Sequence, residues 1–157
     1  MSKKNIFYFS IILLIFLADR ISKLWIISFS DSSNNPNIEV LPFINLHLIW
    51  NKGIAFGLFS FSEKYNYNFL TFLIFIVIIV VFWMLLKSKG LEKYGFIFVF
   101  GGSLGNVYDR IFYSAVPDFI DIYYKNFHWF IFNVADIFIT LGVIVLILNE
   151  FFLKKQK

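Results

Sequence analysis

The chain has 157 residues, of which 59% are hydrophobic and only 15% charged, and its mean hydropathy is +0.75. Soluble domains contain about 45–50% apolar and about 25% charged residues, so this composition predicts one integral membrane domain over residues 1–157, with little left for a separate soluble domain. The formal charge of +4 does not point to nucleic acid, because the basic residues flank apolar segments, and the lack of cysteine excludes disulfides, thiolate metal sites and a cysteine nucleophile.

The first apolar segment, residues 5–27, follows two lysines and has the length of a membrane-spanning helix, which needs about 20 residues. It starts like a signal peptide, but no small-residue cleavage site follows it, so we expect an uncleaved first span. Asp19 and Lys23 are four residues apart and can pair on one helix face. We interpret Arg20 and Lys23 as interfacial anchors. An acidic side chain at this depth is costly, so Asp19 indicates a function.

The segment 28–66 has a different character, because it begins with a stretch rich in serine, asparagine and proline. Residues 40–50 then alternate apolar and polar side chains, which predicts a strand. Two glycines bracket an apolar pair in Asn51–Gly57; this pattern fits either an interfacial turn or a loop whose backbone approaches a ligand. Residues 56–65 predict a short amphipathic helix on the bilayer surface.

Three further spans are predicted over residues 67–86, 94–113 and 130–152, with a short basic turn at 87–93 and a loop at 114–129. Gly101 and Gly105 in the third span have the GxxxG spacing that lets another helix approach closely. The basic residues at both termini and in the 87–93 turn fall on one side of a four-span protein, which is therefore predicted to be cytoplasmic. The segments 28–66 and 114–129 then share the outer side.

Four polar residues near that outer side are candidates for catalysis. Asp118 lies in the predicted loop, and Asp136 lies at the start of the fourth span. Two carboxylates held close together share a proton, so the pair offers an acid and a base at once. Such a pair can activate water against a peptide carbonyl and protonate the leaving nitrogen. Asn106 and Asn133 are candidates to orient the carboxylates or to bind the peptide backbone.

Other residues support weaker interpretations. We interpret Asp109 and Arg110 as a structural ion pair below the site. Asp121 shares a face with the candidate acid three residues before it if that segment is helical, and it could simply face water. His128 suggests a metal, but no ligand spacing accompanies it. Ser103 lacks a recognisable histidine or lysine partner, which makes a serine nucleophile a weak alternative.

Two other classes of protein explain part of the pattern. A small proton-coupled transporter or channel subunit would use the aspartates as a proton relay. Transporters usually show internal repeats and broken helices near the membrane centre, and no repeat is visible here. A purely structural four-span assembly factor accounts for the apolar spans and leaves the acids unexplained.

Taken together, the motifs resemble lipoprotein signal peptidase (signal peptidase II), an aspartic peptidase family of bacterial inner membranes. The resemblance covers nearly the whole chain: an aspartate followed by a lysine late in the first span, NxGxAFG at Asn51–Gly57, GGxxGNxxDR at Gly101–Arg110, VxDFI at Val116–Ile120 and FNxAD at Phe132–Asp136. The sequence departs from the family pattern at four positions: Arg20, Ile54, Ser103 and Phe130.

The resemblance implies that Asp118 and Asp136 are the catalytic residues. It also implies that seven further residues support or line the site: Asp19, Asn51, Gly102, Asn106, Asp109, Arg110 and Asn133. The implied reaction removes the signal peptide from a prolipoprotein just before a cysteine that carries diacylglyceryl, without a metal or other cofactor.

The implied fold class is an all-α membrane protein with four transmembrane helices, a small extracytoplasmic β-cradle and a short amphipathic interfacial helix. We expect a multi-pass protein of the bacterial cytoplasmic (inner) membrane with both termini in the cytoplasm and the active site near the outer face. Its expected partners are lipid-modified prolipoproteins and membrane phospholipids, with no nucleic acid, and we expect it to act as a monomer.

Overall fold

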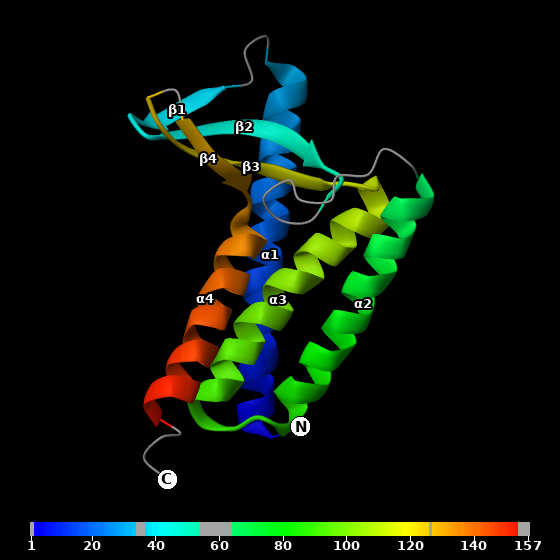
Figure 1. The fold of residues 1–157 in the computed structure, drawn as a ribbon, viewed down its shortest axis with the longest axis vertical. Coiled ribbons are helices and arrows are strands. Elements are labelled where there is room, and N and C mark those ends of the chain that lie inside the picture. Colours follow the sequence, from blue (N-terminus) through cyan, green and yellow to red (C-terminus); the bar gives the residue numbers. More distant parts are fainter. Residues whose placement is uncertain (1, 34–36, 54–63, 126, 154–157) are drawn as a thin grey trace.

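The computed structural model describes residues 2–33, 37–53, 64–125 and 127–153, and these residues form a helical protein with a small antiparallel sheet (Figure 1). The predicted combination of helices and a small sheet is confirmed. The second half of the Asn51–Gly57 motif and most of the predicted amphipathic helix at 56–65 lie outside the described residues.

The helices are α1 (Lys3–Ser32), α2 (Lys64–Lys87), α3 (Gly90–Tyr113) and α4 (Val134–Leu148), and a π-helical turn, η2 (Asn149–Leu153), continues α4. Ser2 caps α1, because its side chain accepts a hydrogen bond from the Asn5 amide. The last helix begins at Val134 and not near residue 130, since the residues before it are extended.

The strands are β1 (Ile38–Leu41), β2 (Ile44–Asn51), β3 (Val116–Tyr124) and β4 (Phe127–Phe132), hydrogen-bonded in the order β1-β2-β3-β4. The predicted strand at 40–50 is confirmed in part, because residues 44–50 lie in β2 whereas residues 40 and 41 belong to β1 and the chain turns at 42–43. The predicted loop at 114–129 is wrong, because these residues form most of a hairpin that completes the sheet. Antiparallel pairing of β2 with β3 places Ile49 opposite Asp118 and so joins two distant parts of the chain.

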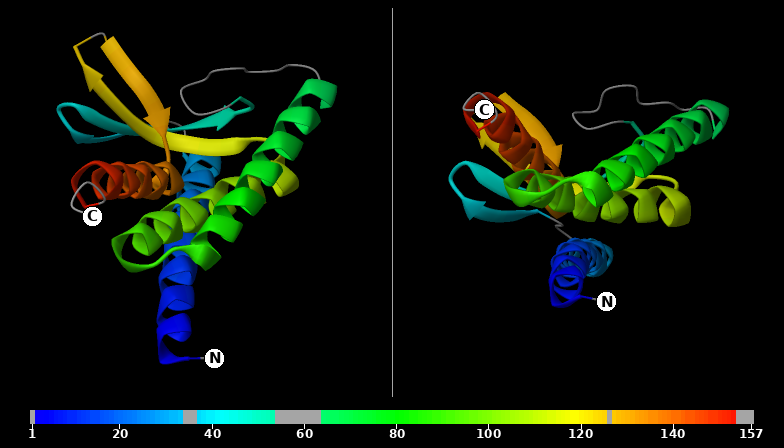
Figure 2. Two further views of the ribbon diagram at one scale, coloured as in Figure 1. Left: turned by 60° about the horizontal axis from the view of Figure 1, so that its bottom comes forward. Right: turned by 90° about the horizontal axis from the view of Figure 1, so that it is seen from below.

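The sheet lies across one end of the helices (Figure 1). The start of α1, the connection between α2 and α3, and the end of α4 lie at the opposite end. Helix α3 contacts each of the other three helices, and the view from below shows it between α2 and α4 (Figure 2). Residues at the sheet end of α3 are therefore close to both neighbouring helices and strands.

Glycines on α3 allow two helices to approach it closely. A Cβ atom on Gly101 would lie 3.2 Å from the Ile15 side chain of α1, and one on Gly102 would lie 2.5 Å from the Ala135 carbonyl oxygen of α4. A Cβ atom on Gly105 would overlap the Asp19 carboxylate. The prediction that Gly101 and Gly105 admit another helix is therefore confirmed.

Large apolar side chains cover the outside of the helices, as expected of a protein surrounded by lipid. Leu14, Leu86 and Phe112 are 66%, 63% and 65% exposed, respectively. Within the described residues, two helical stretches, Tyr67–Lys87 and Val134–Phe152, are long and apolar enough to cross a membrane. The helices α1 and α3 carry more ionisable side chains, and several of these are buried within the protein.

Candidate active site

Asn133 connects the two candidate catalytic carboxylates. It lies between β4 and α4, where it caps the helix. Its side-chain nitrogen donates to Asp118 Oδ1 at 2.6 Å, and its backbone N–H donates to Asp136 Oδ2 at 3.2 Å. One fully buried asparagine therefore holds Asp118 on β3 and Asp136 on α4 at the same place.

Asp118 is buried near the start of β3, with 4% of its surface exposed. Its second oxygen accepts a hydrogen bond from Asn51 Nδ2 at 2.8 Å, so the pairing of β2 with β3 supplies a second amide. Burial and then the nearby charge of Asp136 raise the pKa of Asp118 to about 6, although the hydrogen bonds from Asn51 and Asn133 act in the opposite direction. Asp118 can therefore carry a proton near neutral pH.

Asp136 is the third residue of α4 and forms a reciprocal capping box with Asn133. The side-chain nitrogen of Asn106 on α3 donates to its Oδ1 at 2.8 Å. Donors on two elements thus fix both oxygens, while the residue itself is only half-buried. Asp136 is held rigidly and still borders open space.

A buried ionic cluster lies next to Asn106. Lys23 on α1 donates to Asn106 Oδ1 at 2.8 Å and to Asp109 Oδ2 at 2.7 Å, and its Nζ lies 2.9 Å from the Asp19 carboxylate. Arg20 Nη2 lies 2.6 Å from Asp109 Oδ1. The interpretation of Arg20 and Lys23 as interfacial anchors is wrong, because both side chains point into the protein and neutralise the two acids there.

The same cluster fixes the start of α4. Ala135 is completely buried at the second position of that helix, and its backbone N–H donates to Asp19 Oδ1 at 3.0 Å. This N–H belongs to the first helical turn, whose amide groups have no partner within the helix. Asp19 therefore ties the helix that carries Asp136 to α1.

Arg110 does not pair with Asp109, which corrects the predicted structural ion pair. Its guanidinium donates to the carbonyl oxygen of Gly53, and the Gly53 N–H donates to Asn51 Oδ1 at 2.8 Å. Successive residues on a helix point in directions about 100° apart, so Asp109 faces Lys23 while Arg110 faces the β2 end. Arg110 thereby supports the segment that places Asn51 against Asp118.

Asp121 lies on the opposite face of β3 from Asp118, since side chains alternate along a strand. It is completely buried, so the suggestion that it faces water is wrong, as is the helical alternative. Its Oδ2 lies 2.7 Å from His128 Nδ1 on β4 and 3.9 Å from His47 Nδ1 on β2. Asp121 therefore links three strands and takes no part in the carboxylate pair.

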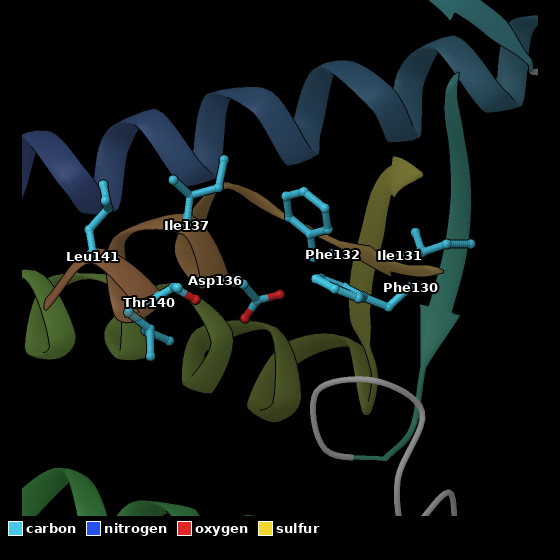
Figure 3. Close-up of a pocket in the computed structure, with 8 residues that line it drawn as sticks. Phe130, Ile131, Phe132, Asp136, Ile137, Thr140 and Leu141 are labelled. Atoms are coloured by element: carbon cyan, nitrogen blue, oxygen red, sulfur yellow. The ribbon is translucent and has the colours of Figure 1, made fainter. Parts of the chain in front are cut away.

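An apolar pocket of about 410 Å³ opens beside Asp136. It is lined by residues of β4 and α4: Phe130, Ile131, Phe132, Asp136, Ile137, Ile139, Thr140 and Leu141. In Figure 3 the Asp136 carboxylate points away from the helix axis, into space bordered by the rings of Phe130 and Phe132. The pocket can place an apolar group next to a carboxylate.

The structure brings together eight of the nine residues named from the sequence around one network: Asp19, Asn51, Asn106, Asp109, Arg110, Asp118, Asn133 and Asp136. The ninth, Gly102, acts through packing, because it lets α4 approach α3. Sequence reasoning missed Lys23 and Arg20 as members of the network. Four-residue spacing linked Lys23 to Asp19, but nothing in the sequence indicated Asp109 or Asn106 as its other partners.

The fold and the site together define a helical membrane protein with paired carboxylates beneath a small sheet. A family model for signal peptidase (SPase) II matches residues 11–152. The chain therefore belongs to the signal peptidase II family, a family of membrane peptidases.

Individual relatives agree with this assignment. The chain is 50% identical to "Lipoprotein signal peptidase" of Pelagibacter ubique (strain HTCC1062), over 100% of this chain and 97% of that one. It is 40% identical to "Lipoprotein signal peptidase" of Wigglesworthia glossinidia brevipalpis, over 89% and 91% of the two chains. A bacterial membrane enzyme solved by the in meso method has a similar fold, with a TM-score of 0.75, 28% identity and 92% coverage of each chain.

Proposed function

We propose that this protein is an aspartic endopeptidase that removes the signal peptide from diacylglyceryl-modified prolipoproteins, cleaving just before the lipidated cysteine. Membership of the signal peptidase II family and the names of its relatives support the substrate class. The observation that carries the proposed chemistry is the bridge through Asn133, which holds Asp118 and Asp136 together beside an apolar pocket.

The two carboxyl groups share one proton and act in sequence. The ionised group takes a proton from water as the water oxygen bonds to the scissile carbonyl carbon, and the protonated group donates its proton to the carbonyl oxygen. In the second step the carbon–nitrogen bond breaks. The nitrogen receives a proton from one carboxyl group, and the other carboxylate takes a proton from the diol. One water is consumed, and the pair returns to its starting protonation state.

Amides and backbone groups keep the pair in place throughout this cycle. Asn51 and Asn133 hold the two oxygens of Asp118, while Asn106 and the Asn133 N–H hold those of Asp136. These donors remain fixed when the proton moves, so little reorganisation accompanies the reaction. The raised pKa of Asp118, about 6, supports a pair that holds one proton near neutral pH, and this proton belongs to the pair as a whole.

The apolar pocket beside Asp136 is suited to a substrate that arrives from the bilayer. Six of its eight lining residues are phenylalanine, isoleucine or leucine, and the other two are Asp136 and Thr140. We assign it to apolar parts of the precursor near the scissile bond, either side chains of the signal peptide or part of the diacylglyceryl group. If the pocket holds the diacylglyceryl group, an unlipidated precursor loses this contact.

We further propose that four helices span the bacterial cytoplasmic membrane with both termini inside. The start of α1 and the basic turn between α2 and α3 lie at the end of the bundle opposite the sheet, which supports this orientation (Figure 1). Because the sequence has no cysteine, an introduced one is unique. An impermeant maleimide added to intact spheroplasts should label Asp31→Cys and leave Lys89→Cys unlabelled; the reverse pattern would invert the topology.

The catalytic proposal is tested by a gel-shift cleavage assay in detergent. Purified protein meets a prolipoprotein with and without diacylglyceryl on its cysteine, alongside Asp118→Asn and Asp136→Asn. We expect cleavage of the lipidated form and a loss of about 10⁴-fold or more in either variant, as for removal of a member of a catalytic unit. Each variant is checked for folding by its thermal melting curve.

Asp31→Asn is the matched control, because it removes an exposed acid from the sheet end of α1 without touching the network. It should cleave at the wild-type rate. Full activity in both site variants would refute the carboxylate pair. No cleavage by well-folded wild-type protein would refute the substrate class and would favour a proton-relay function, which pH-driven uptake into reconstituted vesicles would detect.

A further inference from the structure

Lys23 has an unusual position for a lysine in an apolar helix. Its side chain is completely buried, and its ammonium contacts three groups: Asp19 at 2.9 Å, Asp109 at 2.7 Å and the side-chain oxygen of Asn106 at 2.8 Å. An ammonium has three N–H donors and no acceptor. Each donor therefore has a partner, and one of these partners is neutral.

The neutral contact determines which way the Asn106 amide faces. Since Lys23 can only donate, the amide oxygen must point toward it, and the amide nitrogen must point the other way. That nitrogen donates to Asp136 Oδ1 at 2.8 Å. Without the lysine the amide could rotate by half a turn and present its oxygen to Asp136, because the two ends of an amide have nearly the same shape.

A rotated amide would change the catalytic carboxyl group. An oxygen facing Asp136 Oδ1 repels the ionised carboxylate and favours a proton on that oxygen. The shared proton would then be held on Asp136 Oδ1, the oxygen that accepts a hydrogen bond from Asn106 in this structure. Among the hydrogen bonds of the described residues, Asn106 links Lys23 directly to the Asp136 side chain. Lys23 also contacts Asp19, which accepts from the Ala135 N–H of the same helix.

We propose that Lys23 is a positioning residue for catalysis that acts through Asn106: it fixes the orientation of this amide, which in turn keeps Asp136 Oδ1 a hydrogen-bond acceptor. This inference rests on the proposed function of Asp136. It distinguishes Lys23 from Arg20, which also neutralises Asp19 and Asp109 but donates no hydrogen bond to an asparagine among the described residues.

A double-mutant cycle tests the inference. The proteins are wild type, Lys23→Met, Asn106→Ala and the double variant, and kcat and KM are measured separately on the lipidated precursor. We expect each single change to lower kcat by about 100-fold, as for a misplaced catalytic group, with KM altered less than about 3-fold. If Lys23 acts through Asn106, the double variant should have the kcat of Asn106→Ala alone, within about 3-fold.

Lys93→Met is the matched control. Lys93 also donates to protein groups, the carbonyl oxygens of Leu85 and Ser88, but at the opposite end of the bundle. It should affect the melting temperature without affecting kcat. Equal kcat losses from both lysine changes would mean that kcat follows general stability, and the inference would fail.

Two other results would overturn the proposal. If the losses multiply in the double variant, Lys23 acts independently of Asn106; if Lys23→Met retains wild-type kcat, the lysine does not position the site. If Lys23→Met fails to fold, the Asp109→Asn change is added to all four proteins. This change removes the negative charge that the loss of Lys23 leaves unpaired. The kcat values of the four proteins are then compared in the same way. Wild-type cleavage, lost in Asp136→Asn, tests the proposed function separately from this cycle.

Discussion

Helices α2 and α3 have the same length, 24 residues each, and pack against one another, but their side chains serve different purposes. Most of the large apolar side chains of α2 are exposed toward the surroundings, and only a few, such as Leu70 and Ile78, are buried. Helix α3 buries glycines and ionisable residues instead, among them Gly102, Gly105 and Asp109. Exposed apolar side chains therefore dominate α2, whereas α3 is the helix that buries polar groups inside the protein.

The difference shows how a membrane protein can hold charged groups. An isolated charge in hydrocarbon costs at least about 2.5–3.5 kcal/mol, so Asp19, Lys23 and Asp109 need neighbours that come very close. The glycines of α3 permit this, since a side chain at Gly105 would occupy the place of the Asp19 carboxylate. The polar site therefore depends on small residues on α3, whereas α2 is almost entirely apolar.

The largest effect that would test this contrast comes from Gly102→Ala. The added Cβ would lie 2.5 Å from the Ala135 carbonyl oxygen and 2.9 Å from Ile139 Cγ1, so α4 must move away from α3. This movement would stretch the 2.8 Å bond from Asn106 to Asp136. We expect kcat to fall by about 100-fold and stability by about 1–3 kcal/mol, measured by cleavage and thermal melting.

Ser103→Ala is the control for this change, because it lies one residue further on and removes an atom instead of adding one. It should retain wild-type activity, which would also exclude Ser103 as a nucleophile. A Gly102→Ala protein with normal kcat would show that the close approach of α3 and α4 is not needed for the site.

A smaller effect is expected on the pH dependence of stability, through Asp118 on β3, the strand that follows α3. The folded-state pKa of Asp118 is about 6 against an ordinary value of 3.8, so between these values the folded protein binds more protons than the unfolded chain. Its contribution to stability is therefore complete below about pH 4 and is lost as the pH rises through about 6. Asp118→Asn lacks this titration.

The measurement is the melting temperature of wild type and Asp118→Asn from pH 4 to pH 8. The melting temperature of Asp118→Asn minus that of wild type should increase as the pH rises to about 6.5 and then remain level. We expect a shift of a few degrees, since about 1 kcal/mol corresponds to roughly 2–4 °C for a chain of this size. A difference that does not vary with pH would contradict the raised pKa. Asp31→Asn, an exposed acid, should show no such trend.

The sequence predicted the parts of this molecule that local patterns determine. Apolar runs predicted residues 67–86 of α2, alternation predicted most of β2, and ordered motifs named the residues that meet around Asn133. The start of α4 was placed too early, because residues 130–132 are as apolar as a helix and their strand is revealed only by pairing with β3. An apolar strand and an apolar helix are difficult to distinguish by periodicity.

Partners far apart in the chain were the part that the sequence could not predict. A lysine near the end of an apolar segment usually extends to the interface, and only the fold shows that Lys23 meets Asp109, 86 residues later. Similarly, adjacency suggested that Asp109 pairs with Arg110, but helix geometry turns them toward different neighbours. Asp121 was suggested to face water, but it is buried and its carboxylate contacts His128 of β4.

The smallest effect is expected on α2, and it would sharpen the contrast most directly. Val77→Ala changes a side chain that is 59% exposed on the outer surface of a helix expected to span the membrane. Lipid tails are as apolar as the lost methyl groups, so lipid can replace them with little change in free energy, and alanine favours the helix slightly more than valine. We expect unchanged kcat and a change in stability below about 0.5 kcal/mol.

Ile78→Ala, one residue on and buried, should destabilise by about 2 kcal/mol, again without altering kcat. A tenfold loss of cleavage in Val77→Ala would show that the exposed side of α2 contacts the substrate. The proposed difference between α2 and α3 would then be wrong.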